Sequence, residues 1–111
     1  GSITIDADLL RAADMQPNES VVVADIENAA RFETYIIRGE PGSGVIGVNG
    51  AAAHLVSPGD RLIVLAFALM EPAELADHHA RVVVCDASNG IAEQLTYAST
   101  LDASEPAGSW S

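Results

Sequence analysis

The stretch SVVVADIENAARFETYIIR, residues 20–38, decides the fold class. Its first part, Ser20 to Ile26, is a β-branched run that is typical of a buried strand. Residues 27–30 have the composition of a hairpin connection. The next part, Arg31 to Arg38, alternates between two faces, one with Phe32, Thr34 and Ile36 and the other with Arg31, Glu33, Tyr35 and Ile37. The stretch therefore predicts two neighbouring strands in a mainly β protein.

Short strands separated by turns flank this pair on both sides. Before it, residues 3–5 form a short strand, and Asp6 is a good N-cap for a helix over residues 7–13. After it, we expect strands at 45–48, 61–70 and 81–86, with helical turns at 51–55 and 71–77. The run 61–70 is almost wholly apolar and is the expected core strand. About six short strands with small helices favour a closed β-barrel with helical inserts.

The length of 111 residues suits one domain. We assign this domain to residues 1–97 and expect residues 98–111, where periodicity fades, to form a flexible tail. Cys85 is the single cysteine, so an intramolecular disulfide is excluded, and its place after three valines predicts a buried structural thiol. These features favour a reducing, cytoplasmic setting. No segment approaches the roughly 20 apolar residues that a membrane-spanning helix needs.

The charge balance excludes several classes of function. Sixteen acidic side chains stand against five basic ones, for a formal net charge of -11. This argues against nucleic acid and anionic membranes as partners, since both need clustered positive charge. All five basic residues are arginines, and the absence of lysine excludes lysine Schiff-base chemistry and the Walker-type phosphate loop.

Metal and hydrolase sites find little support in the sequence. His78 and His79 are adjacent, so they point in different directions in a regular element and cannot form the usual i, i+4 metal-binding pair. We therefore expect no metal site and interpret both histidines as part of a polar loop. No serine lies in a G-x-S-x-G elbow, which leaves a serine hydrolase without its usual motif.

Three short motifs stand out from this background. The first is Gly1-Ser2 directly before a strand, the second is RFETY at 31–35, and the third is NGAAAH at 49–54. In the third, small residues follow a turn, and a ligand could approach their backbone N–H groups closely. Each motif alone has an ordinary explanation: an expression-tag scar, a strand face and a hairpin turn.

Taken together, in this order and spacing, the motifs resemble the pyruvoyl-dependent aspartate 1-decarboxylase family, which makes β-alanine for pantothenate. Ile5-Asp6 and Gly59-Asp60 extend the match, which runs from Gly1 to about Met70. The resemblance implies a six-stranded double-psi β-barrel and L-aspartate as the substrate. It also implies a homotetramer with active sites between neighbouring subunits.

The resemblance implies a cofactor made from the chain itself. In this family a precursor cuts itself at a Gly-Ser bond, and the serine becomes a pyruvoyl group, which places that group at Ser2. Its ketone takes the substrate α-amine and accepts the electrons released as carbon dioxide departs. Arg31 would bind the substrate's side-chain carboxylate through its guanidinium fork, and Tyr35 would protonate the carbanion. The remaining implied roles are self-processing and substrate contact for Thr34, orientation of a carbonyl for Asn49, and backbone contacts to substrate for Gly50, Ala51 and Ala52.

Several alternatives stay open at the level of sequence. The family precursor has some two dozen residues before its Gly-Ser junction, and this sequence has none of them. Three explanations are open. The N-terminal β-chain segment is separate from this α-chain region, Gly1-Ser2 is a scar, or the chain is a truncated or diverged relative. For function, the alternatives are a pyruvoyl decarboxylase of another acidic amino acid, and an unprocessed barrel homologue with a binding or assembly role.

Overall fold

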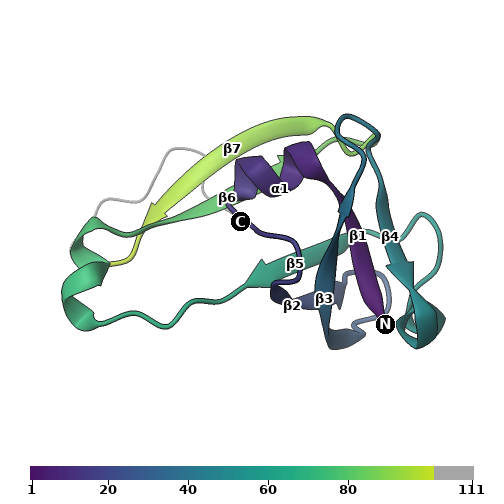
Figure 1. Ribbon diagram of the computed structural model, residues 1–111, viewed down its shortest axis with the longest axis horizontal. Coiled ribbons are helices and arrows are strands. Elements are labelled where there is room, and N and C mark those ends of the chain that lie inside the picture. Colours follow the sequence, from purple (N-terminus) through teal and green to yellow (C-terminus); the bar gives the residue numbers. More distant parts are fainter. Residues whose placement is uncertain (102–111) are drawn as a thin grey trace.

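A computed structural model describes residues 1–101 of the chain (Figure 1). It contains seven strands in two sheets, one α-helix and two 3-10 helices. In chain order these elements are β1 (Ser2–Asp6), α1 (Ala7–Ala13), β2 (Ser20–Asp25), β3 (Arg31–Gly39), β4 (Ile46–Asn49), η1 (Gly50–Leu55), β5 (Leu62–Ala66), η2 (Pro72–Asp77), β6 (His79–Cys85) and β7 (Ile91–Ala98). The prediction of a mainly β protein with small helices is confirmed.

The larger sheet has five strands in the order β4-β1-β3-β2-β5. β2 and β3 are antiparallel, as the predicted hairpin requires, with Val21 opposite Thr34 and Val23 opposite Phe32. β1 lies between β3, to which it is parallel, and β4, to which it is antiparallel. The N-terminal strand is therefore in the interior of the sheet, with hydrogen-bonded neighbours on both sides.

Helix α1 has the predicted bounds and the predicted N-cap. The Asp6 carboxylate accepts hydrogen bonds from the backbone N–H groups of Asp8 at 2.8 Å, Gly42 at 3.0 Å and Gly44 at 2.8 Å. The bond from Gly44 is the largest cause that lowers the pKa of Asp6, and the bonds from Asp8 and Gly42 act in the same direction. One buried carboxylate thus caps the helix and also ties down the loop between β3 and β4.

The core lies on one face of the five-stranded sheet and against α1. Its buried side chains are Ile3, Ile5, Leu9, Leu10, Val21, Val23 and Ile36. On β3, Phe32, Thr34 and Ile36 face this core, while Arg31, Glu33, Tyr35 and Ile37 are exposed on the other face. The predicted alternation of this strand is therefore confirmed.

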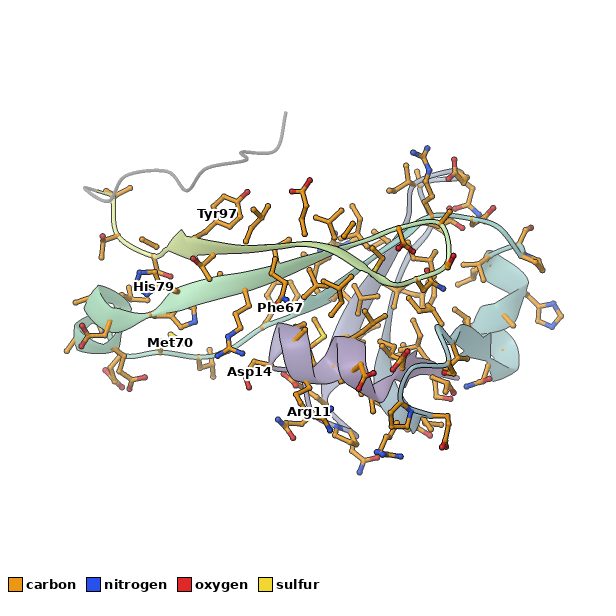
Figure 2. All side chains as sticks on the ribbon, turned by 90° about the horizontal axis from the view of Figure 1, so that it is seen from above. Arg11, Asp14, Phe67, Met70, His79 and Tyr97 are labelled. Atoms are coloured by element: carbon orange, nitrogen blue, oxygen red, sulfur yellow. The ribbon has the colours of Figure 1, made fainter. Side chains whose placement is uncertain are left out.

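The predicted core strand 61–70 is shorter and more exposed than its composition suggested. β5 ends at Ala66, where it is paired with Val21, because β2 begins only one residue earlier, at Ser20. Beyond this point Phe67 is 67% exposed and Leu69 is fully exposed. Figure 2 shows Phe67 and Met70 on the segment that leads away from the sheet. An apolar run without a partner strand does not continue as a strand.

The smaller sheet is a hairpin of β6 and β7, and β6 packs against α1 (Figure 1). Its second strand, Ile91–Ala98, was not predicted. The two sheets do not close into a barrel through hydrogen bonds, so the predicted count of six strands is not confirmed. The proposed flexible tail at 98–111 lies mostly outside the described residues. Within residues 1–101, no helix combines the length and the apolar character needed to cross a bilayer.

Candidate active site

The Gly1-Ser2 junction lies at the start of β1, with the end of β4 beside it. Ser2 is paired with Asn49 in the antiparallel register and is only 5% exposed. A Cβ atom placed on Gly1 would be 2.8 Å from the Asn49 carbonyl oxygen and 2.9 Å from the Ala52 Cβ. The junction is therefore packed so tightly against residues 49–52 that only glycine fits before Ser2.

Asn49 makes the polar contact of this junction. Its Nδ2 donates to Ser2 Oγ at 3.0 Å and to Thr4 Oγ1 at 3.0 Å. Ser2 and Thr4 alternate along β1 and so project from the same face of the sheet. A buried nucleophilic hydroxyl thus has an amide donor held against it.

The turn after Asn49 completes the wall around Gly1. Gly50 has a φ of +69°, and a Cβ atom there would be 3.2 Å from the Gly1 Cα. Ala51 and Ala52 continue into η1, and Ala52 contributes the small side chain against which Gly1 packs. The family resemblance implied substrate contacts for the backbone of Gly50, Ala51 and Ala52, and the structure places Gly50 and Ala52 against the junction itself.

Tyr35 lies level with Ser2 on the neighbouring strand. Ile3 pairs with Ile36 in the parallel register, so Ser2 is one step before this pair, at the level of Tyr35. Adjacent strands are about 5 Å apart, and paired side chains in a parallel ladder project to the same side. Tyr35 and Ser2 therefore share the face of the sheet that is opposite the core, where Tyr35 is 45% exposed.

Arg31 is on the same face as Tyr35 but farther from the junction. It lies four residues before Tyr35 on β3, which is about 13 Å along an extended strand. Among residues 1–101, Arg11 pairs with Asp8 and Arg61 pairs with Glu27, whereas Arg31, Arg38 and Arg81 form no ion pair. The Arg31 guanidinium therefore remains available for a carboxylate.

Thr34 is not brought to the junction. It faces the core beside Phe32 and Ile36, on the opposite side of the sheet from Ser2. Its Oγ1 is buried and has no hydrogen-bond partner among the described residues. Within one chain, the group around Ser2 thus comprises Thr4, Tyr35, Asn49, Gly50 and Ala52, and it does not include the Thr34 side chain.

The other reactive side chains in this part of the chain are the three histidines and Cys85. His54 is exposed in η1. His78 Nδ1 is 2.7 Å from Ser99 Oγ, beside the β6–β7 hairpin. Figure 2 labels His79 and Tyr97 on this hairpin. Cys85 is exposed, so the prediction of a buried thiol is wrong: the hairpin leaves that end of β6 uncovered. Partial desolvation and the nearby Asp86 raise the pKa of the Cys85 thiol, which does not favour a reactive thiolate. No cluster suited to a metal ion occurs within residues 1–101.

Thr4 is a residue at this site that the sequence analysis did not single out. The available signal was its spacing, because a residue two positions after Ser2 on a strand must share its face. The pairing with β4 that brings Asn49 between the two hydroxyls could not be read from spacing alone.

Comparison with known proteins shows the family of the chain. Residues 1–92 match the family model for aspartate decarboxylase. An aspartate 1-decarboxylase of Mycolicibacterium smegmatis is 58% identical over 91 residues, which are 82% of this chain and 67% of the relative. The family match includes the Gly1-Ser2 junction and all five strands of the larger sheet, and it extends through β6. The chain therefore belongs to the aspartate decarboxylase family.

Proposed function

We propose that this chain decarboxylates L-aspartate to β-alanine and carbon dioxide, with a pyruvoyl group made from its own Ser2. The observation that carries the proposal is the buried Ser2 hydroxyl, which accepts a hydrogen bond from Asn49. The residue before Ser2 is Gly1, where a Cβ atom would clash with Asn49 and Ala52. Family membership supplies the reaction class, and the similar M. smegmatis protein is named for this activity. β-Alanine is the product that the family supplies to pantothenate synthesis.

The cofactor would arise by self-cleavage at the Gly1–Ser2 bond. Ser2 Oγ attacks the Gly1 carbonyl carbon, so that a C–O ester bond replaces the C–N peptide bond and the hydroxyl proton moves to the Ser2 nitrogen. Elimination across Cα–Cβ of Ser2 then releases the Gly1 carboxylate, and water displaces the nitrogen as ammonia to leave a ketone. Asn49 occupies one acceptor site of Ser2 Oγ, and the hydroxyl keeps a second lone pair for the attack.

The residues around Ser2 fit such a ketone. Because Ser2 Oγ leaves with the Gly1 carboxylate, Asn49 Nδ2 is then a free N–H donor beside the new terminus, where it can donate to a carbonyl oxygen of the pyruvoyl group or of the substrate. Gly50 and Ala52 add no acidic or bulky side chain. A pyruvoyl group here supplies an electrophilic carbonyl for the α-amine of an amino acid and a sink for the electrons released with carbon dioxide.

The exposed face of β3 supplies groups for the substrate. We assign Arg31 to the side-chain carboxylate, because it shares the exposed face of β3 with Tyr35, forms no ion pair among residues 1–101 and offers a bidentate fork. We assign Tyr35 to proton donation at the α-carbon, because it lies level with Ser2 on the same face. We assign backbone groups of Gly50, Ala51 and Ala52 to contacts with the substrate.

We propose that the site is completed where copies of the chain meet, in a homotetramer. Arg31 lies about 13 Å along the strand from Tyr35, which separates it from Ser2 within one chain. The same face exposes Tyr35, Ile37 and Ile63 to 45%, 39% and 48%. This pattern supports a face covered by a neighbouring subunit, because a sheet usually buries its apolar faces.

Intact-mass measurement tests the proposal directly. After cleavage the wild-type chain should begin at position 2, and its mass should be lower than that of a chain that begins with unmodified serine. Hydroxylamine should add to this terminus, as it adds to ketones. Carbon dioxide should be released from aspartate. Ser2→Ala should lose the ketone and the activity together, whereas Ser20→Ala, which removes a strand hydroxyl bonded to Glu33, should retain both. Carbon dioxide release that survives Ser2→Ala would refute the proposal.

Two alternatives are decided by the same material. Comparison of carbon dioxide release from aspartate and glutamate measures whether the site selects the shorter acid, since Arg31 favours a dicarboxylate without setting its length. A chain that folds but forms no ketone and releases no carbon dioxide would instead support the second alternative, an unprocessed homologue with a binding or assembly role.

A further inference from the structure

Asn49 occupies the N-cap position of η1 but does not cap it. Asparagine is favoured at this position because its side-chain oxygen accepts a backbone N–H of the first turn. Here the Asn49 side chain makes no such bond, although its backbone is extended with φ -112° and ψ 157°, as a cap residue requires. The amide is instead turned back across the sheet toward β1.

Both hydrogens of the Asn49 amide nitrogen have acceptors on β1. Ser2 Oγ and Thr4 Oγ1 each lie 3.0 Å from Nδ2. Ser2 is buried, Thr4 is partly buried and Asn49 is exposed. Thr4 therefore anchors the outer side of an amide whose other hydrogen is directed at the buried serine.

From this geometry we infer that Thr4 is a positioning residue for self-cleavage, one that aims the Asn49 amide at Ser2 Oγ. The inference rests on the proposed pyruvoyl function and adds a residue to it. The terminal torsion of an asparagine side chain is broad, so the amide plane needs an external contact to hold one direction. Thr4 supplies this contact, and the bond from Asn49 in turn restricts the Ser2 side chain before it attacks the Gly1 carbonyl.

The test compares Thr4→Val, which keeps the shape and removes the hydroxyl, with Thr4→Ser, which keeps the hydroxyl. Self-cleavage of the full chain is followed by intact mass. Thr4→Val should slow it by about two- to tenfold, the range expected for one net hydrogen bond. Thr4→Ser should restore the wild-type rate to within about twofold. Thr96→Val removes an exposed threonine hydroxyl from β7 and should leave the rate unchanged.

A double-mutant cycle distinguishes positioning through Asn49 from a general loss of packing. Thr4→Val should have no further effect on the rate in an Asn49→Ala chain, because no amide remains to be aimed. Equal slowing in both backgrounds, or slow cleavage by Thr4→Ser as well, would overturn the inference. If Thr4→Val cleaves at the wild-type rate, the inference fails and the proposed function stands.

A readout without self-cleavage separates the two proposals. In a Ser2→Ala chain, Thr4→Val should change the chemical shifts and speed the hydrogen exchange of the Asn49 side-chain amide, measured by NMR, and Thr4→Ser should not. Unchanged amide signals in Thr4→Val would overturn the role of Thr4. A wild-type chain that forms no ketone would instead overturn the proposed function and the part of Thr4 in it.

Discussion

Substitution of Gly50 by alanine adds one methyl group at the wall of the Gly1-Ser2 junction. The new Cβ would be 3.2 Å from the Gly1 Cα and 3.7 Å from the Gly1 nitrogen. Gly50 also has a φ of +69°, a conformation that side chains disfavour. The substitution therefore combines a backbone penalty with a steric contact at the bond that the chain would cleave.

Gly59 offers a matched control for the backbone penalty. Its φ is +91°, yet a Cβ atom there would have nothing within 4 Å. A left-handed conformation costs a residue other than glycine about 1–2 kcal/mol, and alanine recovers about 0.4–1 kcal/mol by restricting the unfolded chain. Gly59→Ala should thus lose up to about 1.5 kcal/mol. Gly50→Ala should lose up to about 1 kcal/mol more, the lower end of the range for overpacking, because Gly1 and Gly50 are exposed.

Thermal unfolding and intact mass measure the two effects separately. One kcal/mol corresponds to a shift in Tm of about 4–8 °C for a domain of this size. Both variants should therefore melt lower than wild type, and Gly50→Ala should melt lowest. Only Gly50→Ala should also slow the appearance of the chain that begins with the ketone at Ser2.

Either of two results would show that the contact between position 50 and Gly1 does not slow cleavage. If Gly50→Ala cleaves at the wild-type rate, the contact with Gly1 has no bearing on processing. If Gly59→Ala slows cleavage as much as Gly50→Ala, the effect arises from general destabilisation of the fold.

Three further variants probe other groups. Tyr35→Phe should form the ketone normally, since only an exposed hydroxyl is lost, but release β-alanine about 10²-fold more slowly; normal turnover would exclude Tyr35 as the proton donor. Thr34→Val removes a buried hydroxyl that has no partner among residues 1–101, so Tm should stay equal or rise, and a lower Tm would show that the hydroxyl has a structural partner. Burial, and next Asp60, raise the pKa of Asp25 above its ordinary value of 3.8, so the folded chain loses stability as pH rises from 3.8 through that raised pKa. Asp25→Asn should therefore raise Tm at pH 7–8 and lose this advantage near pH 3.8, and equal Tm gains at both pH values would contradict the assignment.

The local elements followed closely from the sequence because their signals are local. Asp6 precedes an apolar helical segment, and helix α1 begins and ends where this pattern predicts. The alternation at residues 31–38 correctly separates the core face of β3 from its exposed face. N-caps and alternation depend on a few neighbouring residues, so the sequence contains all the information that they need.

Exposure was predicted less well because it depends on distant partners. Phe67 and Leu69 belong to an apolar run, but β2 ends its pairing with β5 at Ala66 and leaves them without a strand to pack beside. Cys85 follows three valines, yet it lies at the uncovered end of a two-stranded hairpin. The hydrophobicity of a segment does not predict the length of the strand that pairs with it.

The sequence by itself determined the family, the helix, most strands and the residue types needed for the chemistry: a Gly-Ser bond, an asparagine, an arginine and a tyrosine. Only the tertiary structure decided how these residues meet. The parallel pairing of β1 with β3 puts Tyr35 level with Ser2, and the antiparallel pairing with β4 places Asn49 between Ser2 and Thr4. Strand register joins residues more than 30 positions apart, and a shift of one residue would turn each side chain to the opposite face. For this reason the motifs identify the site, whereas its geometry exists only in the folded sheet.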